Sequence, residues 1–99
     1  MSNLASAYKS QGKYSDAEAL FKPCLDKMKV VLGESNPNTL NTMNSLADVC
    51  DLQGKHSDAE VLFKRCLAKR KVVLGENHPD TLRTMNNLAH LYNHSAENL

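Results

Sequence analysis

Apolar residues recur along two stretches of the chain at alternating steps of three and four, the spacing of one face of an amphipathic helix. Each stretch follows a serine, Ser15 or Ser57, and ends about 18 residues later at a glycine, Gly33 or Gly75. We therefore predict two long helices that each bury one face. The positions on this face are Ala17, Leu20, Phe21, Cys24, Leu25, Met28, Val31 and Leu32 in the first helix, and Ala59, Leu62, Phe63, Cys66, Leu67, Arg70, Val73 and Leu74 in the second.

The two predicted helices belong to a repeat with a period of 42 residues. Residues 1–42 and 43–84 are identical at 26 aligned positions, and the same offset relates Met1, Met43 and Met85. A period of about 20 to 50 residues is typical of a stacked repeat array. The pattern therefore predicts similar structural units that pack side by side.

We expect a single domain over residues 1–95, with repeats at 1–36 and 37–78 and a partial repeat at 79–95. The first copy enters the repeat partway along a helix, which suggests a truncated first repeat or an excised fragment. Residues 96–99 resemble the start of an engineered protease-cleavage linker, so we expect them to lie outside the domain.

Shorter amphipathic segments alternate with the two long ones, at about residues 1–11, 37–52 and 79–92. Pro37 and Pro79 each follow a residue that can cap a helix, and proline is favoured at the first helical position. We therefore predict three further helices. The residues expected to be buried in the second and third of them are Leu40, Met43, Leu46, Ala47 and Cys50, and Leu82, Met85, Leu88, Ala89 and Tyr92.

Local signals mark where the helices start and stop. Gly12 supplies the left-handed residue that ends one helix and lets the chain reverse. Ser15 with Glu18, and Ser57 with Glu60, match a capping box, in which both side chains satisfy amide donors at the helix start. We expect both long helices to begin with this motif.

Pro23 is the one local conflict, because it lies inside the first long helix where the second copy has Arg65. A proline in a helix interior typically costs about 3 kcal/mol and bends the helix. Since the apolar pattern continues in register beyond it, we predict a kink near residues 19–23 and not a break.

Basic residues gather in the last turns of the long helices, where positive charge complements the helix dipole. We interpret this group as solvated and structural, and not as a binding patch. Its members are Lys27, Lys29, Lys69, Arg70 and Lys71.

The 99 residues carry 12 basic and 11 acidic side chains and a formal net charge of +1, which gives no electrostatic case for nucleic acid or an anionic membrane. No apolar run approaches the length of a membrane span, and residues 1–20 lack a basic start followed by an apolar segment, so nothing here favours secretion or membrane insertion. Of the three cysteines, Cys24 and Cys66 are repeat equivalents within the apolar faces, so we interpret them as small buried hydrophobic residues. A reducing, cytoplasmic location is expected.

Sequence motifs of catalysis are missing: the chain has no glycine-rich phosphate loop, nucleophile elbow or plausible triad. His90 and His94 stand four residues apart, a spacing that can hold a metal, with Asp48 on a neighbouring helix. A transition-metal site usually needs three or four ligands, so we favour two solvated histidines. We expect no enzymatic activity, no metal and no cofactor.

The paired helices, with a glycine between them and Phe63 at the junction, resemble a tetratricopeptide repeat. The 42-residue period and the segments Gln53–Glu60, Val73–Leu82 and Thr84–Ala89 are similar to the repeats of kinesin light chains. The resemblance implies an all-α fold, a right-handed solenoid of about five antiparallel helices in roughly two and a half repeats. It also implies an interaction with a protein or peptide.

In a solenoid of helix pairs, the first helix of each pair lines the concave surface. If the apolar residues of that helix face the core, a neighbouring polar stripe faces the groove. Asparagine can both donate to and accept from a peptide backbone, and the resemblance implies this role for Asn44 and Asn86, with Asn87 nearby. The predicted groove residues are Asn41, Asn44, Asp48, Asp51, Arg83, Asn86, Asn87 and His90, with Ser2, Ser6 and Lys9 at equivalent positions of the first copy.

The alternative is that these side chains are ordinary polar surface. The carboxylates of Asp48 and Asp51 favour a neutral or basic ligand over an acidic one.

Two functions remain in view. The first is a protein interaction module with a peptide-binding groove, which can be the scaffold part of a larger signalling or cargo-adaptor protein. The second is self-association as a homodimer, because the last helix has no following helix to cover its apolar residues. Those residues are Met85, Leu88, Leu91 and Tyr92.

Overall fold

Residues 2–97 fold into five α-helices, as the alternating apolar segments predict. The computed structural model describes the backbone of residues 2–97 and the side chains of residues 4–93. No strand occurs in this part of the backbone, so the all-α prediction is confirmed. The helices are α1 (Ser2–Ser10), α2 (Tyr14–Val31), α3 (Pro37–Leu52), α4 (His56–Val73) and α5 (Pro79–Glu97).

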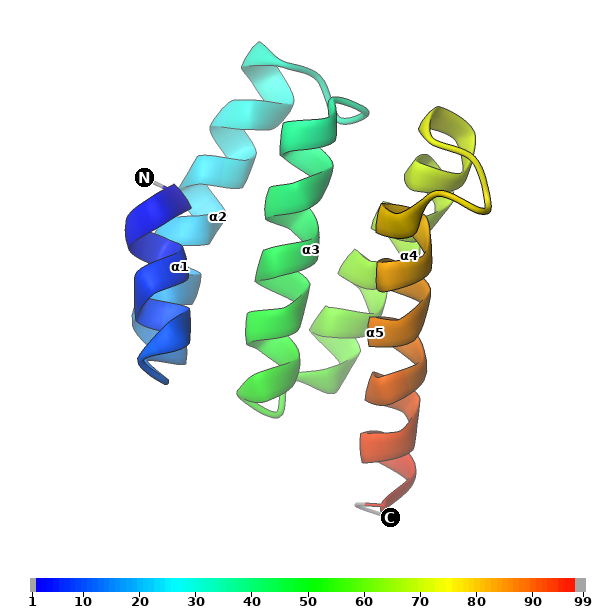
Figure 1. Cartoon of the computed structure of the whole chain (residues 1–99). Coiled ribbons are helices and arrows are strands. Elements are labelled where there is room, and N and C mark those ends of the chain that lie inside the picture. Colours follow the sequence, from blue (N-terminus) through cyan, green and yellow to red (C-terminus); the bar gives the residue numbers. More distant parts are fainter. Residues whose placement is uncertain (1, 98–99) are drawn as a thin grey trace.

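The helices form two layers. In Figure 1, α1, α3 and α5 lie side by side in front, and α2 and α4 lie behind them. Each helix packs antiparallel against the next one, and α3 contacts all four of the others. The array measures 38 × 30 × 19 Å, and α3 is its centre.

Small and aromatic residues shape the core between the layers. Ala17 and Ala59 have no exposed surface, and they allow the second helix of each pair to lie close to its neighbours. Phe21 and Phe63, at most 1 % exposed, fill the space beside them. The apolar core residues of the described side chains are Ala5, Ala17, Phe21, Leu25, Leu40, Met43, Leu46, Ala47, Val49, Cys50, Ala59, Phe63, Cys66 and Leu91.

Gly12 ends α1 as predicted. Its φ of +80° is in the left-handed region, which glycine adopts without strain. The amide of Lys13 donates to the carbonyl of Tyr8 at 2.8 Å, and the amide of Gly12 donates to that of Lys9 at 3.1 Å. These two bonds make a Schellman motif, which satisfies carbonyls at the helix end.

The predicted capping boxes are wrong in both long helices. The N-cap residues are Lys13 and Lys55, and neither helix has a side-chain hydrogen bond at its cap. Because each helix begins one residue before its serine, Ser15 and Ser57 lie inside the first turn. A capping residue must precede that turn, so their hydroxyls cannot fill the role. The first residues of α3 agree better with expectation, because the side chain of Asn36 accepts from the amide of Asn38 at 2.9 Å.

Glu18 joins the two repeats. Its residue is only 7 % exposed, and its carboxylate contacts Lys55 Nζ at 2.8 Å, Gln53 Nε2 at 3.0 Å and Lys22 Nζ at 3.0 Å. Gln53 and Lys55 lie in the turn between α3 and α4, so the carboxylate ties α2 to the next helix pair. The hydrogen bond from Lys55 outweighs the opposing effect of burial and, with Gln53 and Lys22, lowers the pKa of Glu18 to about 2.

The first long helix runs through Pro23 without a break, from Tyr14 to Val31. Pro23 is exposed, so its ring projects into solvent and not into the core. The continuity agrees with the expectation for this residue, and the angle of the kink stays a prediction.

The last helix, α5, extends further than the sequence pattern predicts. It runs to Glu97, beyond the predicted end at Tyr92, because residues 93–97 contain neither glycine nor proline to stop it. Residues 96 and 97 therefore continue the helix, and residues 98–99 lie outside the part that the structure describes.

Several residues of α5 that were expected to be buried are exposed. Leu82 is 44 % and Met85 42 % exposed, whereas the equivalent Leu40 and Met43 have no exposed surface. The reason is that α3 lies between α2 and α4, while α5 packs against α4 and α3 and has no described helix on its other side. We call Leu82, Met85, Ala89 and Tyr92, all exposed, the open face of α5.

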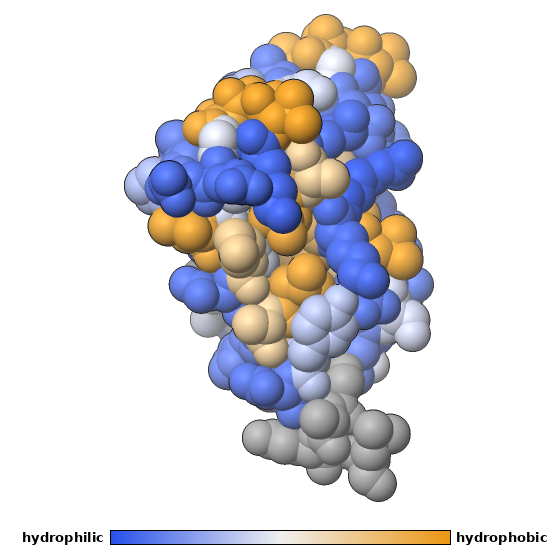
Figure 2. Space-filling view, turned by 90° about the vertical axis from the view of Figure 1, so that its right-hand side faces the viewer, coloured by the Kyte–Doolittle hydropathy of each residue, from blue (hydrophilic) through white to orange (hydrophobic). Residues whose placement is uncertain are grey.

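The residues of α5 that do face the core are Thr81, Thr84 and Leu91, each at most 2 % exposed, with Leu88 partly buried against them. The prediction that Leu88 and Leu91 form part of the uncovered apolar surface of this helix is therefore wrong, because both lie on the side packed against the core. Leu82 and Ala89 belong to the open face instead. Figure 2 views this side of the molecule and shows hydrophobic patches among hydrophilic side chains.

None of the three cysteines, which all lie within the described residues, forms a disulfide. Cys66 is fully buried as predicted and Cys50 is 2 % exposed, whereas Cys24 is half-buried. Burial raises the pKa of the Cys50 and Cys66 thiols, which keeps them in the unreactive protonated form. Among the described residues, no helix is long and apolar enough to span a membrane.

Candidate peptide-binding surface

The predicted groove residues lie on α3 and α5, the middle and last helices of the layer that also contains α1. We call the surface formed by these three helices the odd-helix face (Figure 1). The structure separates the predicted residues into those that hold this layer together and those that project from it. Asn41, Asn44, Asp48 and Asp51 belong to α3, and Arg83, Asn86, Asn87 and His90 belong to α5.

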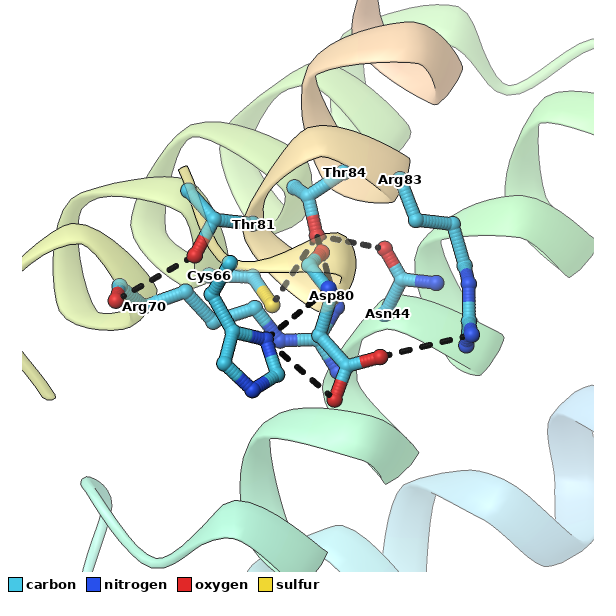
Figure 3. Close-up of polar contacts among 8 residues, drawn as sticks. Asn44, Cys66, Arg70, Asp80, Thr81, Arg83 and Thr84 are labelled. Atoms are coloured by element: carbon cyan, nitrogen blue, oxygen red, sulfur yellow. Dashed lines mark hydrogen bonds and ion pairs between the residues drawn. The ribbon is translucent and has the colours of Figure 1, made fainter. Parts of the chain in front are cut away.

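Asn44 links α3 to α5. Its Oδ1 accepts a hydrogen bond from Thr84 Oγ1 at 3.2 Å and one from Asn87 Nδ2 at 3.5 Å, and the residue is only 7 % exposed. Figure 3 shows its side chain pointing at Thr84. Asn44 and Asn87 contact each other, and Asn44 also contacts Thr84, so Asn44 is first of all a structural residue.

Arg70 on α4 contacts Thr84, the hydrogen-bond partner of Asn44. Its buried position contradicts the interpretation that Arg70 is solvated. The residue is 2 % exposed. Its Nη1 donates to the carbonyl of Asp80 at 3.0 Å and to Thr84 Oγ1 at 2.8 Å, while its buried Nε has no hydrogen-bond partner. The sequence contains an indication of this placement, because Arg70 aligns with Met28 in the repeat and both lie on the predicted apolar face of their helix.

Asp80 organises the start of α5. Its carboxylate lies 3.3 Å from Arg83 Nη2, and its backbone amide donates to His78 Nδ1 at 3.1 Å (Figure 3). The imidazole of His78 therefore caps the helix, as the His-Pro sequence predicts. Because Arg83 is exposed, its pairing with Asp80 is weak and leaves the guanidinium accessible from solvent.

The two acidic residues predicted for the groove are both paired. Asp48 Oδ2 lies 2.6 Å from Lys9 Nζ, which connects α3 to α1. Asp51 is 8 % exposed and its Oδ1 lies 2.9 Å from His56 Nδ1 at the start of α4. Asp51 is thus withdrawn from the surface, and Lys9 offsets the charge of Asp48. These pairs reduce the negative charge of the two carboxylates, and the expectation of a neutral or basic ligand stays a prediction.

Four of the predicted residues are exposed: Asn41, Arg83, Asn86 and His90. Asn86 is exposed, whereas its repeat equivalent Asn44 is 7 % exposed. The difference between Asn86 and its repeat equivalent Asn44 follows from α5, which covers Asn44 but has no described helix over its own far side. The side chain of His94 lies outside the described residues, and no group of three potential metal ligands occurs among those that are described.

Asn41 lies at a pocket that the sequence did not predict. The pocket has a volume of about 220 Å³ and is formed where α1, α2 and α3 meet. Phe21 and Met28 supply its apolar lining, and the other lining residues are polar and uncharged. The lining residues are Ser6, Phe21, Met28, Asn38, Asn41, Thr42 and Ser45.

The comparison with known families agrees with this architecture. The family model for the tetratricopeptide repeat matches residues 1–71. The chain belongs to the tetratricopeptide repeat family. No curated protein matches it at a significant level. Tetratricopeptide repeats generally mediate protein–protein interactions and are typically not enzymes, which agrees with the function class expected from the sequence.

Proposed function

We propose that this array binds an extended peptide segment of a partner protein on the odd-helix face. The observation that carries the proposal is the combination of the exposed amides of Asn41 and Asn86 with the side-chain-sized pocket beside Asn41. An amide side chain offers both donors and an acceptor, so it can pair with a peptide backbone of any sequence. A pocket adds selectivity for one side chain of that peptide.

The charges on this face favour a neutral peptide. Lys9 offsets Asp48 at 2.6 Å, and Arg83 faces Asp80 at 3.3 Å. No uncompensated group of one sign results from these pairs. Binding is therefore expected to depend on hydrogen bonds and apolar contact and to change little with ionic strength.

A random peptide library displayed on phage tests the proposal directly. Peptides selected on the wild-type chain are then measured against the double variant Asn41→Leu and Asn86→Leu. We expect a loss of affinity of at least tenfold, because both exposed amides are removed without touching the core. Asn77→Leu is the matched control, since Asn77 is an exposed asparagine outside the helices. Failure to select any peptide, or equal affinity of the double variant, would overturn the proposal.

Asn44 is less suitable for this experiment than the exposed asparagines. It accepts hydrogen bonds from Thr84 and Asn87, so Asn44→Leu breaks a contact between helices as well as altering the surface. A loss of binding in that variant would not separate recognition from stability.

Self-association is the second candidate function, supported by the open face of α5. Leu82, Met85 and Tyr92 are each more than 40 % exposed, on the side where the equivalent residues of α3 are covered by α4. Two copies can bury these faces against each other as a homodimer. Sedimentation equilibrium over a wide concentration range measures it: a dimer that Met85→Glu converts to a monomer supports this function, and a wild-type monomer throughout excludes it.

We further propose that the repeats are of the kinesin-light-chain type and serve a cytoplasmic scaffold or cargo-adaptor protein. The 42-residue period and the three free cysteines support this narrower assignment. The sequence of the parent protein, with its neighbouring domains, is the test.

A further inference from the structure

The two junctions between helix pairs in this array are related by the 42-residue repeat but differ in one buried residue. The first junction is formed by α1, α2 and α3, and the second by α3, α4 and α5. Met28 in the first corresponds to Arg70 in the second, and Thr42 corresponds to Thr84. The two threonines are both buried and both bond to their counterpart: Thr42 Oγ1 donates to Met28 Sδ at 3.3 Å, and Arg70 Nη1 donates to Thr84 Oγ1 at 2.8 Å.

In the second junction the long arginine side chain occupies the space under the odd-helix face. Arg70 reaches from α4 to the carbonyl of Asp80 on α5, and Thr84 continues the contact to Asn44 on α3 (Figure 3). All three helices are tied together by this chain of hydrogen bonds. The junction therefore offers a bound peptide a polar and largely closed surface.

In the first junction the shorter thioether leaves the space open. The pocket of about 220 Å³ lies there, with Phe21 and Met28 among its lining residues. Pockets for whole small molecules are commonly about 300 to 1,000 Å³, so this one has the scale of a single side chain. The exchange of arginine for methionine therefore leaves, at the first junction, a pocket that can hold one side chain of a bound peptide.

We propose that this pocket holds one uncharged aliphatic side chain, leucine or methionine, of the peptide bound on the odd-helix face. The inference rests on the proposed function, and it names the chemistry that this site selects. The aromatic ring of Phe21 and the polarisable thioether of Met28 provide apolar contact for such a group.

The rim of the pocket explains why a charged side chain is rejected. Every residue that lines it is electrically neutral, and Asn38, Asn41 and Ser45 supply amides and a hydroxyl but no counter-ion. A buried charge without a partner is strongly disfavoured. The same neutral groups can pair with the peptide backbone on either side of the anchored residue, which places the anchor at the α1 end of the array.

The array itself supplies the variants for a test. Met28→Arg gives the first junction the residue that the second already accommodates, with Thr42 in the place of Thr84, so the variant is expected to fold. Arg70→Met makes the reciprocal change. Asn41→Trp covers the mouth of the pocket from an exposed position and leaves its inner part unchanged. Thermal unfolding followed by circular dichroism checks that each variant is folded.

The probes are acetylated and amidated tripeptides, Gly-X-Gly, in which X is leucine, methionine, glutamate or lysine. Titration is followed by NMR of the Met28 methyl group and the Thr42 amide in the wild-type chain. We expect saturable shifts with leucine and methionine and at least tenfold weaker binding of glutamate and lysine. Asn41→Trp and Met28→Arg, the latter followed at Thr42, are expected to weaken leucine binding at least tenfold. In Arg70→Met, the Thr84 amide is expected to gain a response to leucine.

Outcomes that contradict the inference differ from those that contradict the proposed function. If library peptides bind on the odd-helix face, but Met28→Arg changes their affinity less than twofold, the apolar anchor is wrong and the proposed function stands. If the leucine tripeptide titrates Met28 while no library peptide binds, the chemistry of the pocket is supported and the proposed function fails. Equal binding of all four tripeptides overturns the inference.

Discussion

Glu18 on α2 and Lys55 at the start of α4 form an ion pair of 2.8 Å across 37 residues of sequence. The pair is placed where the second helix of one repeat meets the turn of the next. Gln53 adds a hydrogen bond to the same carboxylate at 3.0 Å. Because this contact involves a buried carboxylate, the stability of the junction between the repeats is expected to depend on pH.

Glu18→Gln is expected to destabilise the chain at neutral pH by on the order of 2 kcal/mol and to flatten its acid unfolding. The pKa of Glu18 is lowered from 4.5 to about 2, mainly by Lys55, so the folded state binds this proton less readily than the unfolded state. The stabilisation is complete above about pH 5 and is lost as the pH falls toward 2. Urea unfolding between pH 7 and 2 measures the slope.

The repeat equivalent of Glu18 provides the control for that experiment. The side chain of Glu60 is 36 % exposed and lies 3.7 Å from Lys64, a solvent-exposed pairing that contributes little. Glu60→Gln is expected to leave the acid slope unchanged. If both variants behave alike, burial of Glu18 is not the source of the pH dependence.

Asn44→Leu is expected to cost about 1–3 kcal/mol, because it removes the acceptor of the Asn87 amide and leaves the buried Thr84 hydroxyl only the carbonyl of Asp80, at 3.3 Å. Asn86→Leu, the same substitution at the equivalent exposed position, is expected to change stability by less than about 0.5 kcal/mol. Thermal unfolding of the two variants measures the difference. Equal destabilisation would show that Asn44 does not tie α3 to α5.

Met43→Ala is expected to destabilise the chain by about 2–5 kcal/mol, since Met43 has no exposed surface and its removal leaves a cavity in the core. Met85→Ala, one repeat later, is expected to cost less than about 1 kcal/mol because Met85 is 42 % exposed. The free energies of unfolding from urea titration measure both, at a protein concentration where the chain is monomeric. Similar losses would mean that the open face of α5 is covered in solution.

Pro23→Ala is expected to raise stability by about 1–3 kcal/mol and to straighten α2. The substitution restores an amide donor in the helix interior and removes the clash of the proline ring with the preceding turn. Because Pro23 is exposed, no core contact is lost. Lys27→Ala, an exposed change on the same helix, is the control for helix propensity. A lower Tm for Pro23→Ala would show that the kink is needed for packing.

Much of the architecture follows from local patterns. The steps of three and four predict the long helices to within one residue at each end, and Gly12 and Pro37 mark a helix end and a helix start as predicted. These signals succeed because the backbone conformation of glycine and proline and the period of a helix are properties of short segments.

The serines of the predicted capping boxes show where local reasoning fails. Ser15 and Glu18 have the correct spacing, but Glu18 forms stronger contacts with Lys55 and Gln53 from the next repeat. The second box fails in the same way although Glu60 contacts Lys64 on its own helix, so the start of each helix at the residue before its serine accounts for both failures. The contacts of Glu18 come from residues 35 and 37 positions away, so no short window of sequence around Ser15 contains them.

The candidate site required the tertiary structure most of all. Asn44 and Asn86 are equivalent in the repeat, and only the packing of α5 against α3 makes one a buried acceptor and the other an exposed amide. The pocket beside Asn41 is likewise lined by Met28, whose copy in the second junction is Arg70.

The sequence by itself therefore determined the repeat, the number of helices and the family, because a periodic pattern of apolar residues specifies which faces must be buried. The tertiary structure alone decided which polar residues remain available to a ligand. Burial and hydrogen bonding at a given position depend on which helices lie beside it, and neighbours in space are not encoded in the spacing along a single helix.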